Sequence, residues 1–172
     1  MGLIFLWNKF LKKIRGSAIR NSRIDRNSKV ESGCQIVNSS FAKNSFCGCD
    51  CKILNCSVGE SCYIGDGVIV GGSAHPIEWV STSPVFYEGR DSVKKKFSEY
   101  KRKEDARTII GNKVWIGERV LVKSGVKIGD GAVIEIGSVV TKNVGAYEVW
   151  GGNPAKCIEK RIKFDDKFRI KE

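Results

Sequence analysis

The stretch 109-IIGNKVWIGERVLVKSGVKIGDGAVIEIGSVVTKNV-144 decides the fold, because an aliphatic residue returns in it at every sixth position. The returning residues are Ile110, Ile116, Val122, Ile128, Ile134 and Val140. An α-helix would repeat every 3.6 residues and a half-buried strand every two, so this period fits neither element. It fits a solenoid whose coil has three flat sides, each a short strand.

An earlier part of the chain has the same rhythm, with every third step shortened to five residues. Its repeating residues are Ile24, Val30, Ile36, Phe41, Cys47, Ile53, Val58, Ile64 and Val70. Four residues after each repeating position comes a small or β-branched residue, such as Cys34 or Ala132, and glycine often follows the repeating position directly. We expect about five stacked coils, with the repeating residue inward, the small residue inside the next corner, and glycine easing the tight turns.

This Ile-Gly-x-x-Val-x pattern resembles that of the hexapeptide-repeat acyltransferases over about residues 20–165. The resemblance implies an all-β fold, a left-handed parallel β-helix, although left-handed crossovers are otherwise rare. It also implies a homotrimer with its active site between subunits. We expect an N-terminal amphipathic segment at 1–18, the β-helix at 19–153, and a short, partly helical C-terminal cap at 154–172.

The rhythm stops after Gly72 and resumes at Ile110, which predicts a loop inserted at about residues 73–108. A long loop on a rigid scaffold is a usual place for function. It contains His75, the single histidine of the chain. An imidazole titrates near neutral pH and is suited to take a proton from an alcohol during attack on a thioester.

The loop segment 75-HPIEWVSTSPVFY-87, followed later by 114-VWIG-117, resembles the xenobiotic acetyltransferases and the related sugar O-acetyltransferases, the CatB-related branch of the family. The resemblance implies that His75 is the general base and that Trp115 lines the acyl site. Trp79 and Tyr87 are then candidates for binding the acceptor. Relatives commonly have asparagine where this chain has Ala74, so the group that orients His75 stays open between a backbone carbonyl and Glu78.

The end of the repeats, 137-GSVVTKNVGAYEVWGGNPAKCIEKRI-162, resembles the closing signature of the same family. Carried over by position, Thr141, Lys142 and Lys156 would contact the pantetheine and phosphates of acetyl-CoA, and the backbone at Gly117 and Ile136 would flank the pantetheine arm. Lysine is a reasonable partner for these phosphates. Glu135 replaces a residue that is usually small, which adds a negative charge beside the arm.

Seven cysteines raise the question of a zinc site, since closely spaced cysteines can bind this metal. The solenoid phase argues against it, because Cys49 should face outward while Cys47 and Cys51 face inward. Cysteine then acts as a compact apolar filler. We therefore expect no metal, and reduced thiols in a cytoplasmic protein.

The 172-residue chain has a formal net charge of +11, which favours an anionic partner. Residues 1–16 combine apolar and basic side chains without the order of a signal peptide. They predict a short amphipathic helix that docks on the protein or a neighbouring subunit, or lies on the anionic inner membrane surface. No nucleic-acid-binding motif is present.

The expected activity is transfer of an acetyl group from acetyl-CoA to a sugar hydroxyl, in O-antigen or capsule modification. An antibiotic acceptor of the streptogramin or chloramphenicol type is the alternative within the family. A non-enzymatic membrane-surface scaffold is the alternative of another class. The γ-class carbonic anhydrases share the solenoid but need three histidines for their metal, so this chain does not fit them.

Overall fold

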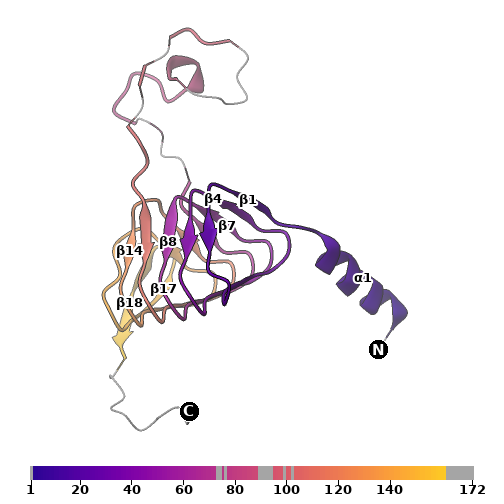
Figure 1. Ribbon diagram of the computed structural model, residues 1–172. Helices are drawn as coiled ribbons and strands as arrows, with labels where there is room; N and C mark the ends of the chain where they lie inside the picture. Colours follow the sequence, from indigo (N-terminus) through magenta and orange to yellow (C-terminus); the bar gives the residue numbers. More distant parts are fainter. Residues whose placement is uncertain are drawn as a thin grey trace.

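A computed structural model describes residues 2–72, 75, 77–88, 95–98, 100–101 and 103–161. Its body is a left-handed parallel β-helix with three sheets, named A, B and C in the order in which each coil visits them (Figure 1). Sheet A contains β1 (Ala18–Arg20), β4 (Gln35–Val37), β7 (Lys52–Leu54), β10 (Ile69–Val70), β13 (Leu121–Val122) and β16 (Val139–Val140). Its six strands give one coil more than predicted, because β1 precedes the first repeating residue.

The other two sheets stack in the same way. Sheet B contains β2 (Arg23–Ile24), β5 (Ser40–Phe41), β8 (Cys56–Val58), β11 (Thr108–Ile110) and β14 (Lys127–Ile128). Sheet C contains β3 (Lys29–Val30), β6 (Phe46–Cys47), β9 (Tyr63–Ile64), β12 (Trp115–Ile116), β15 (Val133–Ile134), β17 (Glu148–Gly152) and β18 (Ala155–Lys160). The β-helix is thereby confirmed.

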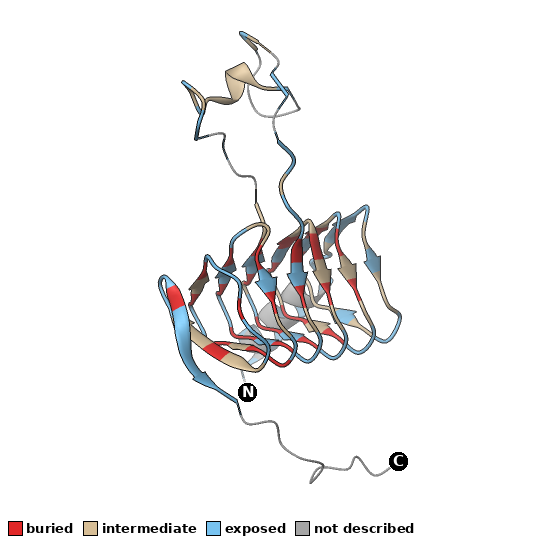
Figure 2. Ribbon diagram, turned by 90° about the vertical axis from the view of Figure 1, so that its left-hand side faces the viewer, coloured by how far each residue is buried: buried red, intermediate tan, exposed pale blue. Residues whose placement is uncertain are grey.

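The interior follows the predicted phase. The repeating residues from Ile36 to Val140 are all buried, and Ile24 and Val30 pack against them from the first coil (Figure 2). Strand partners such as Ile36 and Ile53, or Ile116 and Ile134, are in register, so like side chains stack from coil to coil. Burial of these stacked side chains stabilises the solenoid.

The inward small positions add a regular set of hydrogen bonds. The hydroxyl of Ser45 donates to the carbonyl of Gly59 at 2.7 Å, and the thiol of Cys51 donates to the carbonyl of Gly65 at 3.1 Å. The equivalent bonds of Ser17, Ser28 and Cys34 reach the carbonyl 14 residues ahead. Cysteine at these positions is therefore both a filler, as predicted, and a hydrogen-bond donor to the next coil.

The C-terminal end differs from the prediction. Ala155–Lys160 form the strand β18 instead of a helix, and β18 pairs antiparallel with β17. This hairpin covers β17, the last rung of sheet C, which would otherwise expose its backbone groups. The remainder of the predicted cap, 162–172, lies outside the described residues.

The predicted N-terminal helix is present as α1 (Leu3–Ile14) and projects from the first coil (Figure 1). The side chains of Ile4, Trp7 and Phe10 are 79%, 61% and 53% exposed. Docking of this helix on its own solenoid, one of the alternatives, is therefore not what the structure shows. Arg15 forms an ion pair with Asp50 just after the helix. Within the described residues no helix has the length and apolar character needed to cross a bilayer.

Candidate active site

A groove of about 710 Å³ runs along the edge where sheet C turns into sheet A. Trp115 and Tyr63 form its floor, because strand residues that precede an inward residue point outward. Gly117 and Ile136 follow β12 and β15 and form the turn side of the groove. Three residues that the family resemblance implied, Trp115, Gly117 and Ile136, therefore lie in one place.

Glycine at position 117 is required by the close stacking of two coils. A Cβ atom on Gly117 would lie 2.6 Å from the backbone nitrogen of Ile136, closer than real Cβ contacts. The turn after β12 thus lies directly on the turn after β15. This contact leaves the side chain of Ile136 outside the turn, where it is 68% exposed.

The charges of the groove are mostly negative. Glu118, Glu135 and Glu159 line it, against one cation, Arg161, whose guanidinium donates to the carbonyl of Gly131 at 2.7 Å. Glu135 is the residue predicted to add a charge at this place, and it lies in the groove lining. An uncharged part of a ligand fits such a lining, whereas the phosphates of a ligand would be repelled by it.

The predicted phosphate contacts lie elsewhere. Thr141 and Lys142 follow β16, Lys156 lies on β18, and all three are exposed. None of them lines the groove. They belong to the last coil and its hairpin, so a ligand reaching them from Trp115 would have to pass Ile136 along the solenoid.

An aromatic column on sheet C extends past the groove and was missed by the sequence reasoning. Phe46, Tyr63 and Trp115 occupy matching positions of β6, β9 and β12. The rings of Phe46 and Tyr63 stack with centroids 5.1 Å apart and an interplanar angle of 18°. The signal was available, since Phe46 and Tyr63 are one coil apart in the outward phase.

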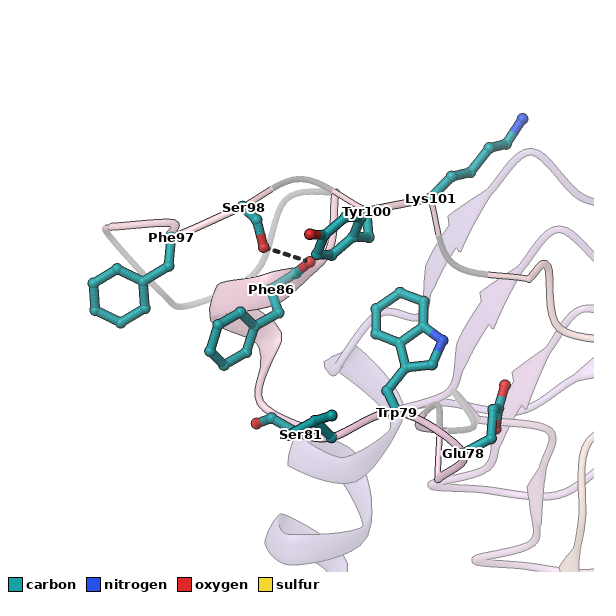
Figure 3. A pocket seen from close by; sticks show the side chains of 9 residues that line it. Glu78, Trp79, Ser81, Phe86, Phe97, Ser98, Tyr100 and Lys101 are labelled. Carbon is teal, nitrogen blue, oxygen red and sulfur yellow. Dashed lines mark hydrogen bonds between the residues drawn. The ribbon is translucent and has the colours of Figure 1, made fainter.

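The inserted loop forms a small lobe with its own aromatic contacts (Figure 3). Trp79 contacts Tyr87 and Tyr100 edge to face, with centroids 6.4 and 6.0 Å apart. The ammonium of Lys96 donates to the carbonyls of Pro84 and Tyr87 at 2.7 and 2.9 Å. The two predicted acceptor residues, Trp79 and Tyr87, thus lie together.

The lobe borders an open pocket of about 840 Å³. Its lining residues are Glu78, Trp79, Val80, Ser81, Phe86, Phe97, Ser98, Tyr100 and Lys101 (Figure 3). Apolar and aromatic side chains with a few polar groups at the margin are typical of a pocket for a small molecule. Tyr87 supports Trp79 but is not itself part of the lining.

His75 is exposed and lies in the loop, which leaves the solenoid where sheet A turns into sheet B (Figure 1). The groove with Trp115 lies on a different edge of the same prism, where sheet C turns into sheet A. Within one chain, therefore, the candidate base and the candidate acyl site are not neighbours. Among the described residues, neither Glu78 nor a backbone carbonyl forms a hydrogen bond with the His75 ring.

The one cysteine group that could hold a metal in the described part of the chain is Cys34, Cys47 and Cys51, with sulfur atoms within 4.8 Å of one another. All three are buried, and Cys34 and Cys51 donate to the carbonyls of Gly48 and Gly65. The three neighbouring thiols act on one another: the pKa values of Cys47 and Cys51 are raised, that of Cys51 to about 12, and the pKa of Cys34 is lowered to about 3. Their burial and their hydrogen bonds to backbone carbonyls agree with a role in packing, and the absence of a metal remains a prediction.

Part of the chain matches a known family model, and several curated proteins are similar to it in sequence. Residues 107–142 match the model described as bacterial transferase hexapeptide (six repeats). Chloramphenicol acetyltransferase from Escherichia coli is 39% identical over 113 residues, which are 63% of this chain and 53% of that protein. Galactoside O-acetyltransferase from Escherichia coli strain K12 is 41% identical over 63 residues, 37% of this chain and 31% of that protein. The chain spans about half the length of the chloramphenicol acetyltransferases it matches.

Solved structures agree on the fold. AntD, an N-acyltransferase from Bacillus cereus in complex with dTDP and 3-hydroxybutyryl-CoA, aligns with a TM-score of 0.66 at 16% identity, over 91% of this chain and 89% of that one. The sixfold rhythm, the β-helix and the sequence relatives all lead to the same group. Residues 107–142 carry the bacterial transferase hexapeptide repeat, and the chain resembles the hexapeptide-repeat acyltransferases in sequence and in fold.

Proposed function

We propose that this protein transfers an acetyl group from acetyl-CoA to a hydroxyl of a sugar, with His75 as the general base. The observation that carries the proposal is the groove in which Trp115, Gly117 and Ile136 lie together. The relatives named as acetyltransferases support the reaction class, and the galactoside relative supports a sugar acceptor.

The charges of the groove agree with this use. The pantetheine arm is uncharged and fits beside Ile136 and Gly117, although Glu118 and Glu135 flank them. The phosphates would then lie beyond the groove, at Thr141, Lys142 and Lys156, where exposed ammonium groups can pair with them. Trp115 would lie beside the acetyl group, and the column of Tyr63 and Phe46 would continue toward the acceptor.

The base must come from a second copy of the chain. Because His75 and Trp115 are on different edges of the prism, the proposed site forms where the loop of one subunit meets the groove of the next. A homotrimer about a threefold axis provides three such subunit interfaces. The lobe with Trp79 and Tyr87 would then cover the acceptor beside the imidazole.

The proposed chemistry is direct transfer. His75 accepts the proton of the acceptor hydroxyl while its oxygen attacks the acetyl carbonyl, and the imidazolium returns the proton to the departing thiolate of CoA. Holding both substrates in one groove removes much of the entropic barrier. The reaction needs no nucleophilic serine or cysteine of the enzyme.

Purified protein tests this proposal directly. The His75→Ala variant should lower kcat by about 10²- to 10⁴-fold, because a positioned base contributes this much. The matched control is Thr82→Ala, an exposed residue of the same loop, which should retain activity. Thermal unfolding of both variants should match that of the parent, and a fully active His75→Ala variant would remove the base from the mechanism.

A second acceptor class has specific support. The chloramphenicol acetyltransferases match more of this chain than the galactoside relative does, 63% against 37%. The assay therefore compares oligosaccharide fragments of surface polysaccharides with chloramphenicol and a streptogramin. Rapid acetylation of an antibiotic alone would replace the sugar assignment.

The helix α1 supports work near a membrane. Its exposed side chains Ile4, Trp7 and Phe10 are apolar, and the charged residues of 1–16 are all lysine or arginine. Such a helix can lie in the interface of an anionic bilayer. The protein should sediment with vesicles that contain phosphatidylglycerol and should not sediment with vesicles of phosphatidylcholine alone. The Trp7→Ser variant should bind the phosphatidylglycerol vesicles more weakly.

A further inference from the structure

A second recess lies away from the groove, on the edge where sheet A turns into sheet B. It has a volume of about 560 Å³ and lies at the base of the inserted loop. Its lining residues are Asn21, Ser22, Arg23, Asn38, Ser39, Ser40 and Arg107. Among the described residues, the lining thus contains two arginines and five neutral polar residues, and none that is acidic.

Arg107 is held rigidly at the edge of this recess. Its Nε donates to the hydroxyl of Ser57 at 2.7 Å, one terminal nitrogen donates to the carbonyl of Asn38 at 3.0 Å, and the other to the carbonyl of Cys56 at 2.9 Å. A fourth, longer bond reaches the hydroxyl of Ser40 at 3.4 Å. All four acceptors are neutral, so the guanidinium is fixed in place but its charge is not compensated by them.

Arg23 provides the second positive charge. It lies on β2 in register with Ser40 of β5, and it points outward because its neighbour Ile24 packs against the core. The ion pairs seen in the described part of the chain involve Arg15, Lys29, Lys43 and Lys160 but neither Arg23 nor Arg107. Within that part, two guanidinium groups without an ion pair thus flank the hydroxyl of Ser40.

This arrangement fits an oxyanion. Guanidinium groups bind phosphate with charge-assisted hydrogen bonds, and a pre-positioned guanidinium loses little entropy on binding. Four of the five N–H groups of Arg107 are used in the bonds above, so Arg107 offers its charge and one N–H, on Nη1, while Arg23 can provide paired bonds. Serine hydroxyls and asparagine amides can donate to the remaining oxygens. The formal net charge of +11 draws anions toward the protein, and this recess offers them a specific site.

We propose that Arg107 and Arg23 bind a phosphate group of the acceptor. The recess adjoins the base of the loop, because the amide of Asn55 donates to the carbonyl of Asp105 at 2.8 Å, two residues before Arg107. A phosphate held there would anchor the acceptor on the same edge as His75. The proposal rests on the proposed acetyl transfer only in assigning this phosphate to the acceptor.

Binding is measured first without acetyl-CoA, by calorimetric titration of the full chain with a hexose 1-phosphate, inorganic phosphate and the uncharged hexose. The parent should bind the hexose 1-phosphate more tightly than either of the others. Arg23→Gln and Arg107→Gln should each weaken this binding about tenfold, the loss expected for one charge-assisted contact. The matched control is Arg26→Gln, an arginine of the same coil outside the lining, and it should bind as the parent does.

The variant Arg23→Gln separates binding from a merely structural role, because the four bonds that fix Arg107 to the coils stay intact. If Arg107 only fastens the loop, Arg23→Gln will bind phosphate like the parent, and the proposal is wrong. Equal affinity for inorganic phosphate and the hexose 1-phosphate would overturn the assignment to the acceptor. In the transfer assay, Arg23→Gln should raise KM for a phosphorylated acceptor without changing KM for acetyl-CoA.

The two proposals can fail separately. If the parent transfers no acetyl group but binds phosphate tightly and through Arg23, the proposed reaction is rejected and the oxyanion site is kept. Acetyl transfer that is unaffected by Arg23→Gln, together with no phosphate binding, would keep the reaction and reject the site.

Discussion

The two functional edges of the prism are built in different ways. The edge between sheets C and A, with Trp115 and Gly117, consists of tight turns stacked in register, where Gly117 and Ile136 touch backbone to backbone. The edge between sheets A and B carries the long loop with His75, whose lobe is held by its own aromatic contacts. One edge is therefore fixed by the repeat, and the other is free to vary in length and shape.

This difference suits a site whose parts come from two edges of the solenoid. The repeat supplies a groove along one edge, and the loop on another edge carries the proposed base and the pocket proposed for the acceptor. Neither edge holds every part of the proposed site. In the proposed mechanism a second copy of the chain joins them, so assembly would be a condition of activity.

Mixing two inactive variants tests this division most strongly. Ile136→Asp places a negative charge in the groove at a position that is 68% exposed, so it should prevent CoA binding without unfolding the protein. His75→Ala removes the base. Each variant alone should be inactive, whereas trimers formed by co-expression should recover activity at roughly a quarter of the interfaces, if subunits mix at random.

The control for this experiment is a chain that carries both changes, co-expressed with the His75→Ala variant. No interface in such a mixture joins an intact groove to an intact base, so activity should stay absent. Failure of the two single variants to complement each other would place the whole site within one subunit.

Stability should depend on the solenoid interior much more than on its outer face. Ile116 is fully buried, and its replacement by alanine should lower the free energy of unfolding by about 2–5 kcal/mol. The matched control is Ile109→Ala on β11, where the side chain is 43% exposed and the loss should be below about 1 kcal/mol. Urea unfolding measures both, and equal losses would contradict the inward phase.

The last turn before the C-terminal hairpin should weaken in acid. The carboxylate of Glu148 accepts hydrogen bonds from the indole of Trp150 at 2.9 Å and the backbone of Gly145 at 2.8 Å, and these bonds lower its pKa. A lowered folded-state pKa means that this stabilisation is present at neutral pH and is lost as the pH falls below the ordinary value, about 4.3. Glu148→Gln should therefore reduce the fall in Tm between pH 6 and pH 3, and an unchanged slope would contradict this role.

Thiol reactivity gives the smallest expected effect. Cys157 is exposed on β18, while Cys34, Cys47, Cys51, Cys56 and Cys62 are buried, and burial raises the pKa of Cys56 to about 12. An aromatic disulfide reagent should react rapidly with Cys157, and Cys157→Ser should remove this fast phase. Rapid reaction of the buried thiols would mean that the first coils open readily.

The solenoid was predictable because its interior repeats. A side chain in one coil has an equivalent in the next, so residues such as Ile53 and Ile116 are identified by phase alone. The groove residues Trp115, Gly117 and Ile136 came from the family resemblance, and their gathering on one edge follows from the same phase. The repeat, however, did not reveal β1, since the first coil leaves Ile19 half exposed.

Features outside the repeat were not predictable. Arg107 reaches Asn38 and Ser57 only because the loop returns beside coils that are 50 to 69 residues earlier in the chain. The strand β18 forms because the last coil leaves an unpaired edge, a tertiary effect that outweighs the local helical appearance of the basic tail. Contacts of this kind depend on which distant segments of the chain pack together, and the spacing of residues in the sequence does not predict that packing.

The loop leaves the solenoid after Gly72 and rejoins it at Thr108, and both points lie at a single corner. Closing a flexible segment over a fixed gap costs only about 0.6 kcal/mol for each doubling of its length. The segment can therefore be exchanged, as in a chimaera with a donor loop, without disturbing the register of the coils. Under the proposed assignment of the acceptor to this loop, acceptor specificity can change while the thermal stability of the solenoid is retained.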